Sequence, residues 1–192
     1  MRFSSLILFL SIYSLMAGKI SAQPSPDGKF NLIWLVKLDT PAGKKPVYQA
    51  AINQKDIDKL SQPLRALAAY YSALSGSNCD REDNCGLTTA LGLGKQNSAE
   101  HIGILKKWFS DDIQVKKMIE QNCFVGISGA NHFCEFNILT FQNRNDTVIV
   151  NYEIQCYDQG RGSVFNGKDK AIIGENLIIF EQRAIPWNKG KL

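Results

Sequence analysis

The spacing of hydrophobic residues changes near Cys123, and this change limits the possible folds more than any other feature of the chain. Before Cys123 the apolar residues recur every three to four positions, the period of an amphipathic helix. Examples are Ile57, Leu60, Leu64, Leu67, Tyr71 and Leu74. After it they recur at every second position, the period of a half-buried strand. Examples are Val148, Val150, Tyr152, Ile154 and Cys156. Helices followed by strands predict an α+β fold, with N-terminal helices packed on a curved antiparallel β-meander.

Turn-forming residues divide these two regions into individual elements. We expect a loop and a short helix after the first strand, and a polar turn between the two long strands. The expected strands cover 30–38, 133–141, 147–156, 171–173 and 177–182, and the expected helices cover 63–75 and 87–93. Two more helices are predicted from their caps, one opening at Asn97 with Glu100 as its capping-box partner, and one re-capped at residues 110–112.

Residues 1–22 have the pattern of a secretory signal peptide, with an early Arg2, an apolar run over 6–17 and the small Ala22 at the expected cut. The run is too short for a membrane-spanning helix, which needs roughly 18 or more apolar residues. No later stretch is long enough either, so we expect no membrane insertion. The sequence predicts an exported protein, periplasmic or extracellular, with one α+β domain over 23–192.

The net charge of the chain is small. There are 22 Lys and Arg residues against 18 Asp and Glu residues, a formal charge of +4. Loss of Arg2 and Lys19 with the leader reduces this charge to +2. This small net charge argues against a nucleic-acid partner, because nucleic-acid-binding proteins carry strongly basic surfaces.

All five cysteines follow the leader, and an exported chain meets oxidising conditions. Cys79 and Cys85 bracket a short polar loop, so we expect them to form a disulfide. We also expect Cys134 to pair with Cys156. This follows if a three-residue loop, 144–146, joins the two long strands, because Asn143 then faces Thr147 and the cysteines face each other.

A two-residue loop would instead send Cys134 and Cys156 to opposite faces, and Cys123 could pair with either of them. The same turn contains Asn145 in an Asn-x-Thr sequence, which would be a glycosylation acceptor in a eukaryotic secretory host and accidental in a bacterial one.

No catalytic motif stands out in the chain. There is no phosphate loop, dinucleotide fingerprint, nucleophile elbow or zinc-protease motif, so the sequence indicates no catalytic residue, no cofactor and no metal site. The two histidines, His101 and His132, are expected to be partly exposed at a helix end and in a loop.

The best remaining candidate for a binding site is the polar side of the predicted meander. Five polar residues share a position in the alternation opposite to that of the apolar set. They are Glu135, Asn137, Asn151, Glu153 and Gln155. The favoured interpretation is a solvated outer face. The alternative is a pocket wall in which the two carboxylates bind a polar ligand or act as a base.

Three segments resemble the NTF2-like superfamily, an α+β cone, and in particular its SnoaL-like branch. Residues 67–75 are similar to its first helix, residues 98–109 to its later amphipathic helix, and residues 157–182 to its closing meander. The strand and helix before Pro63 are extra, and the loop between Cys79 and Cys85 replaces the family's early hairpin. The superfamily contains isomerases, dehydratases, cyclases and non-enzymatic binding modules, so the resemblance does not name an activity.

The sequence is therefore compatible with three functions. The first is an exported, non-catalytic NTF2-like module that binds a small apolar ligand or a protein partner. Such a module could also form a homodimer through its sheet. The second is a small-molecule lyase or isomerase that uses Glu135, Glu153 or a histidine. The third is an exported inhibitor or immunity protein.

Overall fold

A computed structural model describes residues 27–74, 86–94, 98–120, 132–158 and 161–184. In these residues the fold is α+β, as predicted, with a six-stranded antiparallel sheet in the order β2-β1-β3-β4-β5-β6. The strands are β1 Gly28–Leu38, β2 Val47–Ile52, β3 His132–Arg144, β4 Thr147–Asp158, β5 Arg161–Ile173 and β6 Ile178–Gln182. The helices are α1 Gln54–Ile57, α2 Gln62–Leu74, α3 Gly86–Ala90, α4 Ala99–Trp108 and α5 Ile113–Glu120.

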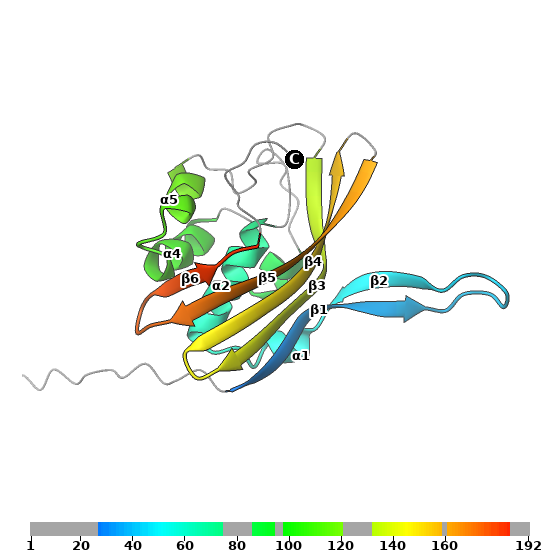
Figure 1. The fold of residues 1–192 in the computed structure, drawn as a ribbon, viewed down its shortest axis with the longest axis horizontal. Helices are drawn as coiled ribbons and strands as arrows, with labels where there is room; N and C mark the ends of the chain where they lie inside the picture. Colours follow the sequence, from blue (N-terminus) through cyan, green and yellow to red (C-terminus); the bar gives the residue numbers. More distant parts are fainter. Residues whose placement is uncertain (1–26, 75–85, 95–97, 121–131, 159–160, 185–192) are drawn as a thin grey trace, which may run out of the picture.

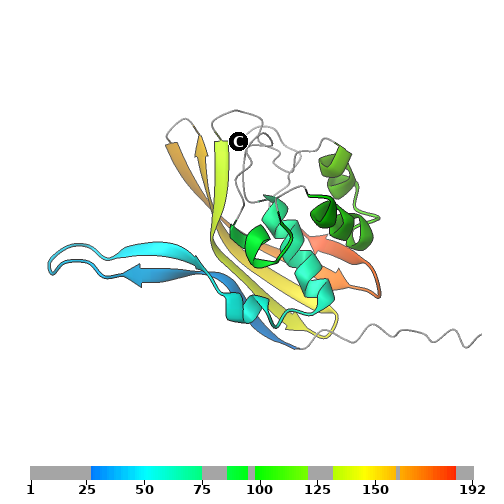
Figure 2. The same cartoon turned by 180° about the vertical axis from the view of Figure 1, so that it is seen from behind.

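The helices cover one face of the sheet (Figures 1 and 2). Helix α2 is central, and it contacts both α3 and α4. Its Pro63 lies in the first turn, where a missing amide hydrogen costs nothing. From Ala66 to Leu74 every side chain is buried, because the helix has neighbours all round. The predicted helix over 63–75 is confirmed up to Leu74, and residue 75 lies outside the described residues.

The two later helices begin at side-chain caps. Helix α4 is capped by Ser98, whose hydroxyl accepts from the His101 amide, so the start predicted at Asn97 is wrong by one residue. The same hydroxyl donates to the Leu93 carbonyl at 2.7 Å, which ties the cap to the preceding turn. Helix α5 is capped by Asp112, as predicted.

The β3–β4 hairpin has a shorter loop and a different register from those predicted. Its loop has two residues rather than three, because Arg144 faces Thr147. Asn145 has φ 56°, the left-handed conformation that a two-residue hairpin turn requires. A bulge between Phe136 and Ile138 then shifts the register by one residue. Strands β3, β4 and β5 bend along their length (Figure 1).

The bulge restores the predicted pairing at the far end of the hairpin, where Cys134 faces Cys156 and Phe136 faces Ile154. The predicted pairing of Ile138 with Tyr152 is wrong, because Leu139 takes that place. Cys156 is disulfide-bonded, and its partner sulfur is not among the described side chains. The Cys134–Cys156 bond stays a prediction. Residues 1–22, Cys79, Cys85 and Cys123 lie outside the described residues.

The sequence predicts no strand at β2, whose residues follow the turn-forming stretch 40–46. β1 pairs with β3 only over its first half, up to Ile33. Beyond that point β1 pairs with β2 alone, and the two strands project from the domain as a ribbon (Figures 1 and 2). We call residues 34–52, with the turn between the strands, the arm.

Candidate functional site

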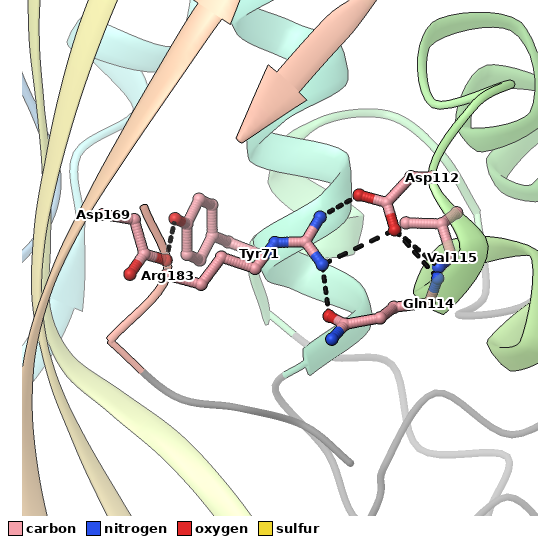
Figure 3. A network of polar contacts seen from close by, with 6 residues as sticks. All are labelled: Tyr71, Asp112, Gln114, Val115, Asp169 and Arg183. Atoms are coloured by element: carbon pink, nitrogen blue, oxygen red, sulfur yellow. Dashed lines mark hydrogen bonds and ion pairs between the residues drawn. The ribbon is translucent and has the colours of Figure 1, made fainter. Parts of the chain in front are cut away.

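A buried carboxylate, that of Asp169, lies between the sheet and α2. Asp169 is 2% exposed. The Tyr71 hydroxyl donates to Oδ2 at 2.6 Å, as Figure 3 shows. The Tyr152 hydroxyl and the Ala184 amide donate to Oδ1 at 3.4 and 2.7 Å. We call these four residues the Asp169 cluster.

The strand geometry explains why Asp169 points inward. It lies opposite Val150, which is buried on the helix-covered face, and opposed residues of neighbouring strands share a face. Gly167, two positions earlier, lies opposite Tyr152. With no side chain at residue 167, the Tyr152 ring occupies that space.

Burial controls the acid–base properties of the cluster. It raises the pKa of the Asp169 carboxyl above its usual range, although the hydrogen bonds from Tyr71, Ala184 and Tyr152 and the charge of Arg183 act in the opposite direction. Burial, together with the nearby Asp169 carboxylate, also raises the pKa of the Tyr71 hydroxyl. Because protein donors contact both Asp169 oxygens, the cluster has the geometry of a structural link between α2, β4, β5 and the chain after β6.

An ion pair lies next to the cluster, between Arg183 and Asp112 (Figure 3). Both side chains are largely buried, and the Arg183 guanidinium also donates to the Gln114 side chain. Asp112 accepts the amides of Gln114 and Val115 at 2.9 and 3.1 Å, so one carboxylate caps α5 and holds the arginine. The pair therefore fastens the end of the sheet to α5.

Aromatic rings fill the space between α2 and the sheet. Tyr71 has ring neighbours at centroid distances of 5.2 to 6.5 Å, which are Tyr70, Phe136, Phe141, Tyr152 and Phe180. The Arg183 guanidinium lies 4.1 Å from the centre of the Phe180 ring. This packing makes the helix-covered face the core of the fold.

The five predicted binding residues lie on the opposite side of the sheet. Three of them come together: the Asn137 side chain donates to Glu153 at 2.9 Å and to Gln155 at 3.5 Å. Glu135 and Asn151 are exposed. The three hydrogen-bonded residues are half-buried. Both interpretations of this face, a solvated outer face and a binding site, stay predictions.

The expectation for His101 is wrong. Its side chain is fully buried, and Nε2 lies 2.8 Å from the Ala69 carbonyl oxygen and 3.3 Å from the Ser72 hydroxyl. Burial lowers the pKa of the imidazole. The cause is tertiary, since α4 packs against α2 and turns the first-turn residue inward. The side chain of His132 is not described.

The exposed turn at Asn145 lies where the sequence predicted it. Its backbone amide donates to the Asp27 carboxylate at 2.5 Å, and the two residues line an open hollow at the N-terminal end of β1. Glycosylation at Asn145 stays a prediction.

The arm exposes apolar side chains on both faces. Trp34, Val36, Leu38 and Val47 share one face, as the register of β1 with β2 shows, and Leu35 and Tyr48 share the other. Trp34 is 50% exposed and Tyr48 is 55% exposed. A turn closes the arm, with Lys44 donating to the Pro41 carbonyl and Gly43 at φ 84°. Sequence reasoning could have found the surface, because residues 30–38 read as a strand with hardly a polar position.

Within the described residues, no helix is long and apolar enough to cross a membrane. The described part of the chain contains no group of three or more His, Cys, Asp or Glu residues that could hold a metal ion. Comparison of the chain with protein-family models, with curated proteins and with solved structures finds no match in any of the three.

Proposed function

We propose that this chain is an exported, non-catalytic binding module that engages a protein partner through its arm. The observation that carries the proposal is the apolar surface on both faces of a projecting two-stranded ribbon. Seven exposed apolar side chains supply it: Trp34, Leu35, Val36, Leu38, Val47, Tyr48 and Ile52.

The free energy of such a ribbon in water supports a partner. Two-stranded hairpins are marginally stable alone, and they gain stability when further strands or a packed layer cover them. The seven side chains are 37 to 55% exposed, and apolar side chains gathered at the surface in this way mark interaction sites. A protein partner removes this surface from water and supplies hydrogen bonds to the free strand edges.

A protein partner fits better than a small apolar ligand, because aromatic rings already fill the space between α2 and the sheet. It also fits better than catalysis, because protein donors occupy both oxygens of Asp169. The NTF2-like cone remains part of the proposal, supported by the bent antiparallel sheet with helices on one face.

Site-specific photo-crosslinking in the compartment of origin tests the proposal. A photoreactive amino acid replaces Tyr48 on the arm and, as the matched control, Ile179 on β6, which is 51% exposed. We expect protein adducts from residue 48 and none from residue 179. An arm that forms no protein adduct, or no more than the control forms, would refute an arm-mediated interaction.

A further inference from the structure

One edge of the sheet lacks the features that normally prevent pairing with another copy of the same chain. Strand β2 is that edge, and its six residues include no charged residue and no proline. Its register with β1 runs from Val47 to Ile52 without a bulge. Charges, prolines and bulges are the usual protections of edge strands in monomeric proteins.

The opposite edge, β6, is protected. Glu181 on this strand forms an ion pair with Lys170 at 2.5 Å. The pairing of β5 with β6 also contains an irregularity between Lys170 and Ala171. Of the two outer strands of the sheet, β2 is therefore the one suited to strand pairing. The free edge of β1 beyond Ile33 carries a charged residue, Lys37.

We infer that the occupant of the β2 edge is a second copy of this chain, which adds its own β2 in the antiparallel direction about a two-fold axis. This inference rests on the proposed function, since it names the partner of the arm. A two-fold axis perpendicular to the sheet pairs each β2 residue with one of the same face. With Ala50 on the axis, Tyr48 of one copy faces Ile52 of the other, and Gln49 faces Ala51.

The charges of the arm fit this arrangement. A residue near a two-fold axis meets its own copy, so a charge there would be repelled, and β2 carries none. The tip carries Asp39, Lys44 and Lys45. In the antiparallel arrangement the two lysines lie on the order of 20 Å from the axis on opposite sides, well beyond the screening length of about 8 Å. The remaining charge, Lys37, lies on β1 and not on the shared edge.

The size of the surface fits a reversible dimer. Each copy contributes one six-residue edge strand with exposed side chains, which is a small contact area. Pairing of the two β2 strands also produces a four-stranded ribbon, which exceeds the three strands that an independently stable sheet needs. We therefore expect a dimer with a dissociation constant in the micromolar range.

Sedimentation velocity of the mature chain tests the inference, over concentrations from about 1 µM to about 500 µM. We expect a concentration-dependent monomer–dimer equilibrium. Ala50→Lys, at an exposed position on the axis, should weaken it at least tenfold, about 1.4 kcal/mol, because two like charges then oppose each other. Ile179→Lys, on the protected edge, should leave it unchanged. Circular dichroism melts of both variants establish that they fold.

A cysteine variant measures the geometry directly. Ala50→Cys should form a covalent dimer under mild oxidation, whereas Ile179→Cys and the parent chain should not. A chain that is monomeric throughout, or a dimer that Ala50→Lys leaves intact, would overturn the inference. If the monomer's arm crosslinks to a different protein, the proposed function stands and the dimer falls. If the chain sediments with phosphatidylglycerol vesicles and forms no protein adduct, both the proposed function and the dimer are refuted.

Discussion

The ring of Tyr152 lies against the backbone of Gly167, its partner across β4 and β5. A Cβ atom at residue 167 would lie 2.1 Å from Cζ of this ring and 2.4 Å from its hydroxyl oxygen. The glycine thus gives Tyr152 the path along which its hydroxyl reaches Asp169. The Asp169 cluster therefore depends on glycine at residue 167.

Gly167→Ala should therefore destabilise the protein, by about 1–3 kcal/mol, because an added methyl group forces the ring to move. Urea denaturation measures the free energy of unfolding. Gly103→Ala is the matched control, since nothing lies within 4 Å of a Cβ at this helical position. It should stabilise the protein by about 0.5–1 kcal/mol. Equal effects of the two substitutions would contradict the close contact.

The second prediction concerns the pH dependence of stability. The folded pKa of Asp169 is raised above the ordinary 3.8, so the folded state favours the protonated carboxyl. The stability that this proton provides is complete below pH 3.8 and is lost as the pH rises through the folded pKa. Asp169→Asn replaces the carboxyl with an amide, which stays neutral at every pH of the experiment.

The Asn variant should therefore gain stability relative to the parent chain as the pH rises above 3.8. Urea denaturation of both proteins at several pH values measures this difference, in which the titration of other carboxyls cancels. A difference that stays constant with pH, or that changes in favour of the parent chain, would show that Asp169 does not titrate as the buried cluster requires.

The third prediction separates the two roles of Asp112. Asp112→Asn removes the charge that pairs with Arg183 but keeps an oxygen that can cap α5. Asp112→Ala removes both. The Ala variant should be less stable than the Asn variant by about 1 kcal/mol, the usual value of an N-cap. Thermal and urea unfolding measure the difference. In an Arg183→Gln background the same difference should remain, because the cap does not depend on the arginine.

The fourth prediction concerns the disulfides. Peptide mapping of the exported protein without reduction should find Cys134 linked to Cys156 and Cys79 linked to Cys85, leaving Cys123 as a thiol. The opposed positions of Cys134 and Cys156 on β3 and β4 support the first pair. A peptide that joins Cys123 to either strand cysteine would show that the bulge aligned the cysteines without bonding them.

Local sequence determined the elements whose side chains follow one clear period. The stripe through Leu64, Leu67 and Tyr71 places α2, and the alternation from Val148 to Ile154 places β4 with its buried face inward. Asp112 marks the start of α5 because its side-chain oxygen meets amides only two and three residues away. Such interactions form within one turn of chain, so a sequence pattern contains them.

The tertiary structure alone decided features that depend on distant neighbours. β2 has no strong pattern of its own, and it is a strand because β1 offers it an edge. The bulge near Asn137 corrects a register that the turn at Asn145 would otherwise have placed one residue off. His101 is buried because α4 packs on α2.

Asp169 shows the physical reason most directly. In sequence it stands between Lys168 and Lys170, which is the usual setting of a solvated residue. Its burial becomes favourable only when Tyr71, Tyr152 and Ala184, from three other parts of the chain, each donate a hydrogen bond. The sequence by itself determined which segments have an apolar side. Only the assembled sheet and helices decided which polar groups that side encloses, because desolvation is offset by partners that folding brings together.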